Sequence, residues 1–151
     1  MHNAYLEATE YFFSCVAKMT SDSVDNHHPD GWSARQVIHH MADSEAQFYV
    51  RLRRLLAEPA GSEIQGYDEG AWAECEALGY QTLATEPSLA VIAAVRASSA
   101  LVLEQLNADD LARYGMHTES GLYTLSDWVD IYTRHPREHG DQLLRALDGL
   151  E

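Results

Sequence analysis

The chain has 151 residues, 46% of them hydrophobic, and a formal net charge of −14 from 24 acidic residues against 10 Lys+Arg. This length and composition predict a single folded domain over residues 1–151 and exclude a disordered chain. A surface this acidic repels phosphate backbones and anionic lipid headgroups, so neither a nucleic-acid partner nor a membrane partner is expected.

The first half of the chain predicts two long helices. The first covers residues 2–19, and a polar connection separates it from the second. Ser33 is the expected N-cap of the second helix, and Gln36 three positions later completes a capping box. This helix is expected to run to about Glu58, because Pro59-Ala60-Gly61 follows it.

The second half predicts two more long helices. A less regular connection, with a short helix over 68–78, precedes a third long helix in which Pro87 takes the first position. The third helix ends near Asn107. After a loop at 111–121, Thr124 begins a fourth helix that runs to about Leu147. No convincing strand interrupts this order, so the predicted fold class is an all-α four-helix bundle.

Three histidines are the main candidates for function: His40 on the second helix, and His135 and His139 on the fourth. His135 and His139 lie about 40° apart on one helix face, within its apolar stripe. His40 borders the apolar stripe of its helix, whereas His39 is expected to face solvent. Buried imidazoles need partners for two ring nitrogens each, and a shared metal ion would satisfy one nitrogen of all three. The alternative is three hydrogen-bonded core histidines.

Pro136 lies between the two histidines of the fourth helix and removes a backbone hydrogen bond, so a kink or bulge is expected there. A helix that simply ends at Arg134 is the alternative. Residues 135–139 also match H-x-x-E-H, the zinc signature of inverzincin peptidases, in which Glu138 would be a general base. A proline inside the motif and the direction of Glu138 both disfavour that interpretation.

Several other features have an ordinary and a functional interpretation. Arg51, Arg53 and Arg54 are expected to form a solvated helix face; the alternative is an electropositive rim that receives an acidic ligand. His117 is expected on a surface loop, although it could approach the mouth of the bundle. The segment 67–72, with Tyr67-Asp68 and Trp72, could line a pocket lid or be a short packed helix.

The sequence also bears on location. No stretch is expected to span a membrane, and Glu7, Glu10 and Lys18 in the N-terminal apolar run do not fit a signal peptide. Cys15 and Cys75 have no metal-type spacing and are expected to be free thiols. These features predict a cytoplasmic protein.

Four blocks of the chain follow the pattern of a known family, namely Gly31–Ser44, Gly66–Ala73, His117–Leu125 and His135–His139. Their most specific part is the Trp-x-x-Arg-Gln-x-x-His-His pattern together with the terminal His-x-x-x-His. On these blocks the chain resembles the DinB superfamily, and more closely its YfiT-like branch. The resemblance covers nearly the whole chain in order.

The resemblance implies a four-helix bundle that holds a divalent metal ion with His40, His135 and His139, often in a homodimer. Such a ligand set suits zinc, nickel or iron. Relatives include S-transferases that use low-molecular-weight thiols, and metal-dependent hydrolases. Two features depart from the family pattern without removing a ligand: Glu45 stands where relatives often carry a further histidine, and Pro136 is unusual.

These inferences predict an enzyme that acts on a small-molecule substrate. The metal would lower the pKa of a bound thiol or water and make it a nucleophile. S-transfer from a low-molecular-weight thiol is the favoured reaction, and metal-dependent hydrolysis is the alternative. A protein that binds a metal or small ligand without catalysis stays open. Asp43 and Glu45 are the candidate proton-handling groups.

Overall fold

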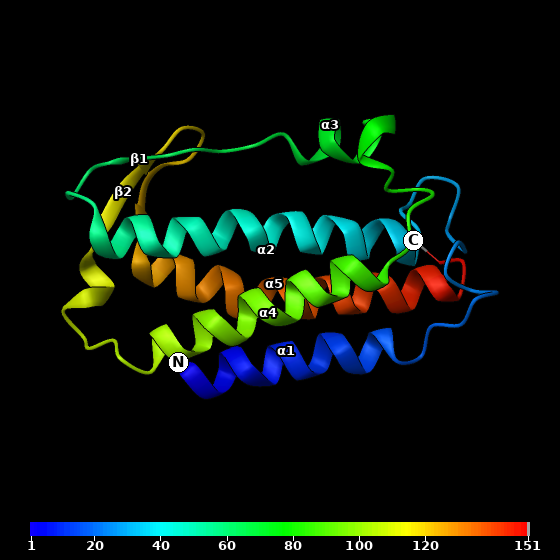
Figure 1. Cartoon of the computed structure of the whole chain (residues 1–151), viewed down its shortest axis with the longest axis horizontal. Coiled ribbons are helices and arrows are strands. Elements are labelled where there is room, and N and C mark those ends of the chain that lie inside the picture. The colour runs from blue at the N-terminus through cyan, green and yellow to red at the C-terminus, as the bar shows by residue number, and fades with distance from the viewer. Residues whose placement is uncertain (151) are drawn as a thin grey trace.

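Four long helices run along the length of the molecule in the computed structural model, which describes residues 1–150 (Figure 1). The first helix packs against the last, and the second packs against both the third and the last. The predicted four-helix bundle is confirmed, with helix ends a few residues from the expected ones. The helices are α1 (His2–Val16), α2 (Ala34–Ala57), α4 (Glu86–Leu103) and α5 (Leu125–Leu147).

Both predicted capping boxes are present at the starts of α2 and α5. The Ser33 hydroxyl accepts a hydrogen bond from the Gln36 amide, and the Gln36 side chain accepts one from the Ser33 amide. Thr124 and Asp127 repeat this arrangement. Each box satisfies backbone donors that the first helical turn leaves free, and so fixes where the helix begins. The face on which every later side chain lies follows from that start.

α5 continues through Pro136 as one helix from Leu125 to Leu147. The alternative in which the helix ends at Arg134 is therefore wrong. His135 and His139 consequently keep the spacing of successive helical turns.

A small three-stranded sheet at one end of the bundle corrects the expectation that the chain has no strand (Figure 1). The segment 111–121, expected as a loop, forms most of an antiparallel hairpin. Strands this short, one of them containing Gly115, give no readable alternation of polar and apolar residues. A Cβ at Gly115 would lie 2.6 Å from the Ile64 side chain, so only glycine lets the first strand approach. The strands are β1 (Glu63–Ile64), parallel to β2 (Tyr114–His117), which pairs antiparallel with β3 (Gly121–Thr124).

The connection between β1 and α4 runs back along the outside of α2 (Figure 1). In place of the single expected helix over 68–78 it contains α3 (Glu69–Glu74) and a 3-10 turn (Glu76–Leu78). Asp68 caps α3 by accepting a hydrogen bond from the Ala71 amide. The residues just before α3 are held beside α2 by a hydrogen bond from Arg51 of α2 to the Gln65 carbonyl.

The core consists of two apolar clusters with polar groups between them. One cluster includes Phe48, Leu52 and Trp128, and the other includes Phe12, Ile38 and Leu143. Burial of such side chains supplies the main driving force for closing the bundle.

A buried ion pair joins all four long helices. Arg96 of α4 donates to Glu45 of α2 over 2.5 Å, and both side chains are 1% exposed. The same guanidinium donates to Thr9 and to the Tyr5 carbonyl on α1, and to the Tyr132 carbonyl on α5. Because each nitrogen of the Arg96 guanidinium donates to an acceptor, this charge is tolerated in the interior.

α4 is long and apolar enough to cross a membrane by length and composition alone, which corrects the expectation that no stretch would be. Core helices meet the same criterion, and α4 carries the buried Arg96 in its middle. From residue 88 to residue 103 its exposed face has no charged side chain, and the exposed residues there are Ala90, Val91, Ala93, Ala94, Ala97 and Leu101. Homodimer formation stays a prediction.

Candidate metal centre

The three predicted histidines lie together, although His40 is on α2 and the other two are on α5. Nε2 of His139 lies 3.2 Å from Nε2 of His40 and 3.0 Å from Nε2 of His135. Each residue offers one nitrogen, and these nitrogens lie within 4.8 Å of one another, as in groups that hold a metal ion. His40 is buried, and the α5 pair is half-buried.

The outer ring nitrogens show which atoms face the centre of the cluster. Nδ1 of His139 lies 2.7 Å from the Gln142 Oε1 atom, which can only accept a hydrogen bond. His139 therefore carries its hydrogen on Nδ1 and presents the Nε2 lone pair to the cluster. Nδ1 of His40 and Nδ1 of His135 are buried and have no hydrogen-bond partner within residues 1–150.

Burial lowers the pKa of all three imidazoles. It lowers the pKa of His40 to about 3, with a further contribution from His139. The pKa of His135 falls well below its usual range because of burial and the neighbouring His139 and His40. Burial likewise lowers the pKa of His139. The cluster is thus neutral at neutral pH, and three convergent neutral imidazoles fit a divalent transition-metal ion.

Acidification should destabilise the metal-free protein through these histidines. Their pKa values are lower in the folded chain than the unfolded value near 6.5, so the unfolded chain binds more protons. The stability that this provides is complete above about pH 6.5 and is lost as the pH falls towards about 3, the pKa of His40. Each histidine that is protonated only in the unfolded state lowers the free energy of unfolding by about 1.4 kcal/mol for every unit that the pH falls.

Urea unfolding of metal-free wild type and His40→Gln, followed from about pH 7 to about pH 4, measures this effect. Carboxylates titrate in both proteins, so the difference between the two slopes isolates His40. The variant should have the shallower slope. His27→Gln, which removes an exposed histidine, is the control and should match wild type. Identical slopes for wild type and His40→Gln would contradict the assignment.

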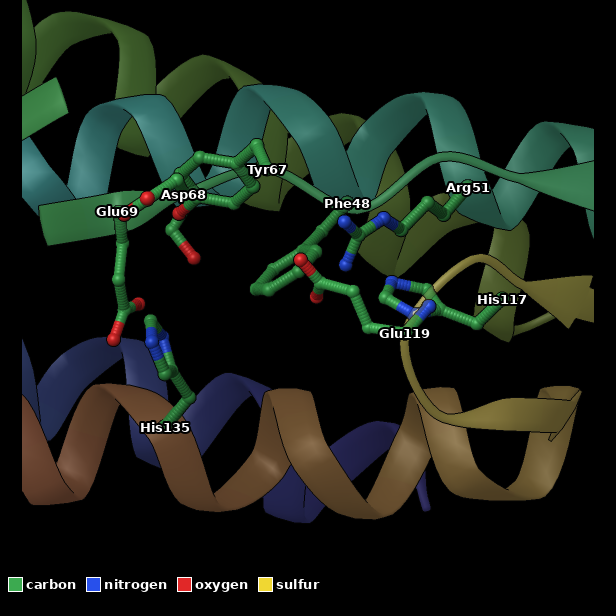
Figure 2. A pocket seen from close by; sticks show the side chains of 9 residues that line it. Phe48, Arg51, Tyr67, Asp68, Glu69, His117, Glu119 and His135 are labelled. Atoms are coloured by element: carbon green, nitrogen blue, oxygen red, sulfur yellow. Dashed lines mark hydrogen bonds between the residues drawn. The ribbon is translucent and has the colours of Figure 1, made fainter. Parts of the chain in front are cut away.

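His135 of the cluster lines a cleft of about 530 Å³, a size typical of small-molecule sites. In Figure 2, α2 and the segment before α3 form one side, α5 forms the other, and the β2–β3 hairpin closes one end. The lining residues are Ser44, Phe48 and Arg51 from α2, Tyr67, Asp68 and Glu69 from the connection, His117 and Glu119 from the hairpin, and His135 from α5.

Two segments that the sequence left open contribute to this cleft. His117 was expected on a surface loop, but it lies on β2 and lines the cleft, so that expectation is wrong. Tyr67 and Asp68 line the cleft too, in agreement with the pocket-lid alternative. Trp72 instead packs against the Tyr67 ring at 4.6 Å between centroids.

His39 does not face solvent, which corrects the sequence-based expectation. It is 6% exposed, with Nδ1 2.8 Å from the Ser88 hydroxyl and Nε2 3.2 Å from the Leu83 carbonyl. The residues that lead into α4 pack over this face of α2. Helical periodicity within α2 alone could not predict this contact with a distant segment. Because both ring nitrogens have partners elsewhere, His39 stays outside the cluster.

Three carboxylates considered as catalytic groups are engaged elsewhere. Glu45 forms the buried ion pair with Arg96, and Asp43 accepts a hydrogen bond from the Tyr80 hydroxyl at 2.6 Å. Glu138 pairs with Arg134 on the exposed side of α5 at 2.9 Å. None of the three lines the cleft. The expectation that Asp43 or Glu45 handles protons is therefore not supported.

Sequence reasoning missed Glu69 as a residue of the cleft, and the solvated face expected for Arg51 is wrong, because Arg51 is buried and lines the cleft, in agreement with the electropositive alternative. Oε2 of Glu69 lies 3.9 Å from Nε2 of His40, and the Glu69 side chain is 64% exposed. No spacing rule relates a residue in this connection to a histidine on α2. Arg51 could have been found, because it lies about 20° from His40 on an ideal wheel, about three turns further along α2.

Comparison with known proteins places this bundle in a family. A family model described as the DinB superfamily matches residues 4–143. The chain belongs to the DinB superfamily. The resemblance inferred from the sequence is thus confirmed, and it extends over nearly the whole bundle.

Relatives within the DinB superfamily carry names that refer to a metal. The chain is 34% identical over 125 residues to "Putative metal-dependent hydrolase OB0782" of Oceanobacillus iheyensis, which covers 82% of this chain and 70% of that protein. It is 31% identical over 126 residues to "Putative metal-dependent hydrolase YfiT" of Bacillus subtilis, covering 82% and 69%.

A solved structure has the same fold. The structure of YfiT from Bacillus subtilis superposes with a TM-score of 0.84 at 27% identity, covering 99% of this chain and 86% of that one. YfiT is described there as a probable metal-dependent hydrolase with an unusual four-helix bundle topology.

Proposed function

We propose that this DinB protein is a metal-dependent enzyme with His40, His135 and His139 as its metal ligands. The observation that carries the proposal is a cluster of three neutral imidazoles, one of which, His135, lines a cleft. A divalent metal ion bound there would lower the pKa of a thiol or water and make it a nucleophile at neutral pH. Three protein ligands leave a coordination position for a small molecule, which is typical of catalytic sites.

The residues around the cluster provide for proton transfer and for desolvation. Oε2 of Glu69 faces the cluster at 3.9 Å from His40 and can accept the proton of an incoming nucleophile. Its exposure lets it return that proton to solvent. Phe48, with its ring centroid 5.7 Å from that of His135, keeps the adjoining wall apolar.

We further propose that the reaction is S-transfer from a low-molecular-weight thiol to an electrophile. The thiol proton passes to Glu69 or solvent, the sulfur bonds to the electrophilic carbon, and the leaving group departs with its electron pair. A free thiol has a pKa near 8.5 and free water one near 15.7, so a bound metal ion would have to lower the pKa of a thiol far less than that of water to give a nucleophile at neutral pH. The names of the relatives favour hydrolysis, which is the second candidate.

Turnover of a chromogenic chloronitroaromatic with a panel of small thiols, with and without added metal, tests the proposal. Metal-dependent thiol consumption that His40→Ala abolishes is the expected result. Glu69→Gln should retain its metal but react roughly 100-fold more slowly. Glu74→Gln, which removes an exposed acidic group of α3 outside the cleft, should match wild type.

Two other results would replace this proposal. Metal-dependent ester cleavage without thiol consumption would establish the hydrolase. Tight metal binding with neither activity would establish a non-catalytic metal-binding protein.

A further inference from the structure

Arg51 is a buried positive charge in the wall of the cleft. The residue is 8% exposed, and Figure 2 shows its guanidinium directed into the cleft beside Phe48 and Glu119. The guanidinium carbon lies 5.0 Å from the centroid of the Phe48 ring. A charge removed from water to this extent normally has an anionic partner.

Few hydrogen-bond donors of the Arg51 guanidinium have a partner within the protein. Nη2 of Arg51 donates to the Gln65 carbonyl at 2.8 Å, which holds the segment before α3 against α2. Nε of Arg51 is buried and has no hydrogen-bond partner within residues 1–150, and no carboxylate of those residues lies within ion-pair distance. A guanidinium offers five N–H donors, so tethering Gln65 accounts for only one of them.

The two groups beside Arg51, the Tyr67 hydroxyl and the His117 imidazole, do not supply the missing anionic partner. The Tyr67 hydroxyl, in the same wall, is buried without a hydrogen-bond partner among the described residues. His117 faces this end of the cleft, and burial and Arg51 together lower its pKa. Glu119 lines the same end, but it is exposed and can turn towards solvent. Arg51 is thus the only arginine or lysine among the residues that line the cleft, whose acidic members are Asp68, Glu69 and Glu119.

We propose that Arg51 and the Tyr67 hydroxyl bind the carboxylate of a small molecule whose other end reaches the three histidines. The substrate class is thus a thiol, or an ester or amide, that carries a carboxylate several bonds from its reacting group. A guanidinium suits this role because its planar fork matches a carboxylate. This inference rests on the proposed metal-dependent function and adds a substrate preference to it.

The geometry of α2 sets the length of such a molecule. Arg51 follows His40 by about 16 Å along the helix axis and lies on nearly the same face. Helical side chains lean towards the N-terminus, so the Arg51 guanidinium reaches back towards the cluster. Arg51 and His135 both pack against the Phe48 ring, which places the two ends of the site within one small-molecule length.

Binding of matched ligands to cobalt-loaded protein tests this inference without turnover. One series consists of ω-mercaptocarboxylates of increasing chain length, compared with the corresponding ω-mercaptoamides. A second series replaces the thiol with a hydroxamate, which imitates the carbonyl end of an ester or amide. Cobalt absorption reports binding at the metal in both series, and the two series distinguish a thiol from a hydrolytic substrate.

At one preferred chain length, wild type should bind the carboxylate about tenfold or more tightly than the amide. Arg51→Met should lose this preference and leave amide affinity unchanged. Arg54→Met removes a charge from the same helix outside the cleft and should keep the preference. Arg51→Gln can still donate to the Gln65 carbonyl and should also lose the preference for the carboxylate. This second variant shows that the loss does not come from local unfolding in Arg51→Met.

The outcomes separate this inference from the proposed function. A preference that survives both Arg51 variants, or no preference at any length, would refute the carboxylate site while leaving metal-dependent thiol chemistry intact. A preference in the hydroxamate series alone would support the carboxylate site and favour hydrolysis over S-transfer. Both proposals fail if the protein binds no cobalt. They also fail if it binds cobalt but no ligand of either series changes the cobalt absorption.

Discussion

His135→Ala should bind a divalent metal at least about 100-fold more weakly than wild type. Loss of a group that merely orients a ligand costs metal sites 10- to 100-fold, and loss of one of three ligands should cost more. Metal content after dialysis, measured by inductively coupled plasma mass spectrometry, gives the result directly. Wild type should also gain about 2.7 kcal/mol of stability at a metal concentration of 100 times Kd, and the variant should not.

His117→Ala is the matched control for this experiment. His117 lines the same cleft but stands outside the three-histidine cluster, so its removal should leave metal content unchanged. Equal metal content in wild type and His135→Ala would show that His135 is not a ligand. Loss of metal in both variants would indicate that a histidine of the hairpin also binds it.

Arg96→Met should destabilise the fold by about 3–5 kcal/mol. Removing the guanidinium leaves Glu45 charged or protonated in the interior without a partner, and breaking a buried pair in this way is far costlier than losing a surface ion pair. It also leaves the Tyr5 and Tyr132 carbonyls without their donor. Urea denaturation of the metal-free protein measures the change in the free energy of unfolding.

The double variant Arg96→Met with Glu45→Met separates the lost pair from the lost packing. Replacing both charges with apolar side chains should recover most of the stability, because no unpaired charge remains. If single and double variants are equally destabilised, the hydrogen bonds from Arg96 to the helix backbones matter more than the charge of Glu45.

Local sequence patterns were sufficient to predict the four long helices and the convergence of the three histidines. Ser33 and Gln36 mark the start of α2, and once that start is fixed, rotation about the helix separates His40 from the adjacent His39. His135 and His139 follow in the same way from the start of α5. These predictions succeed because each depends on residues within a few turns of one another.

The walls of the cleft could not be predicted in this way. Glu69 and His117 reach it from the two connections, whose positions depend on pairing between β1 and β2 across more than fifty residues of chain. His39 is covered by the approach to α4, which is likewise a contact between distant segments. Arg51 was accessible to helical periodicity, but an arginine near two others on a helix more often indicates a solvated face.

The histidine cluster and much of the cleft wall come from different kinds of segment, and this affects how the family can diversify. The three histidines stand on α2 and α5, whose packing is fixed by the core, whereas Tyr67, Asp68, Glu69, His117 and Glu119 come from the connections. Insertions and substitutions in such segments are tolerated far better than changes in packed helices. Descendants can therefore change the walls of the cleft while keeping the same three histidines, and kinship within the superfamily predicts the histidine cluster better than it predicts the molecule that the cleft binds.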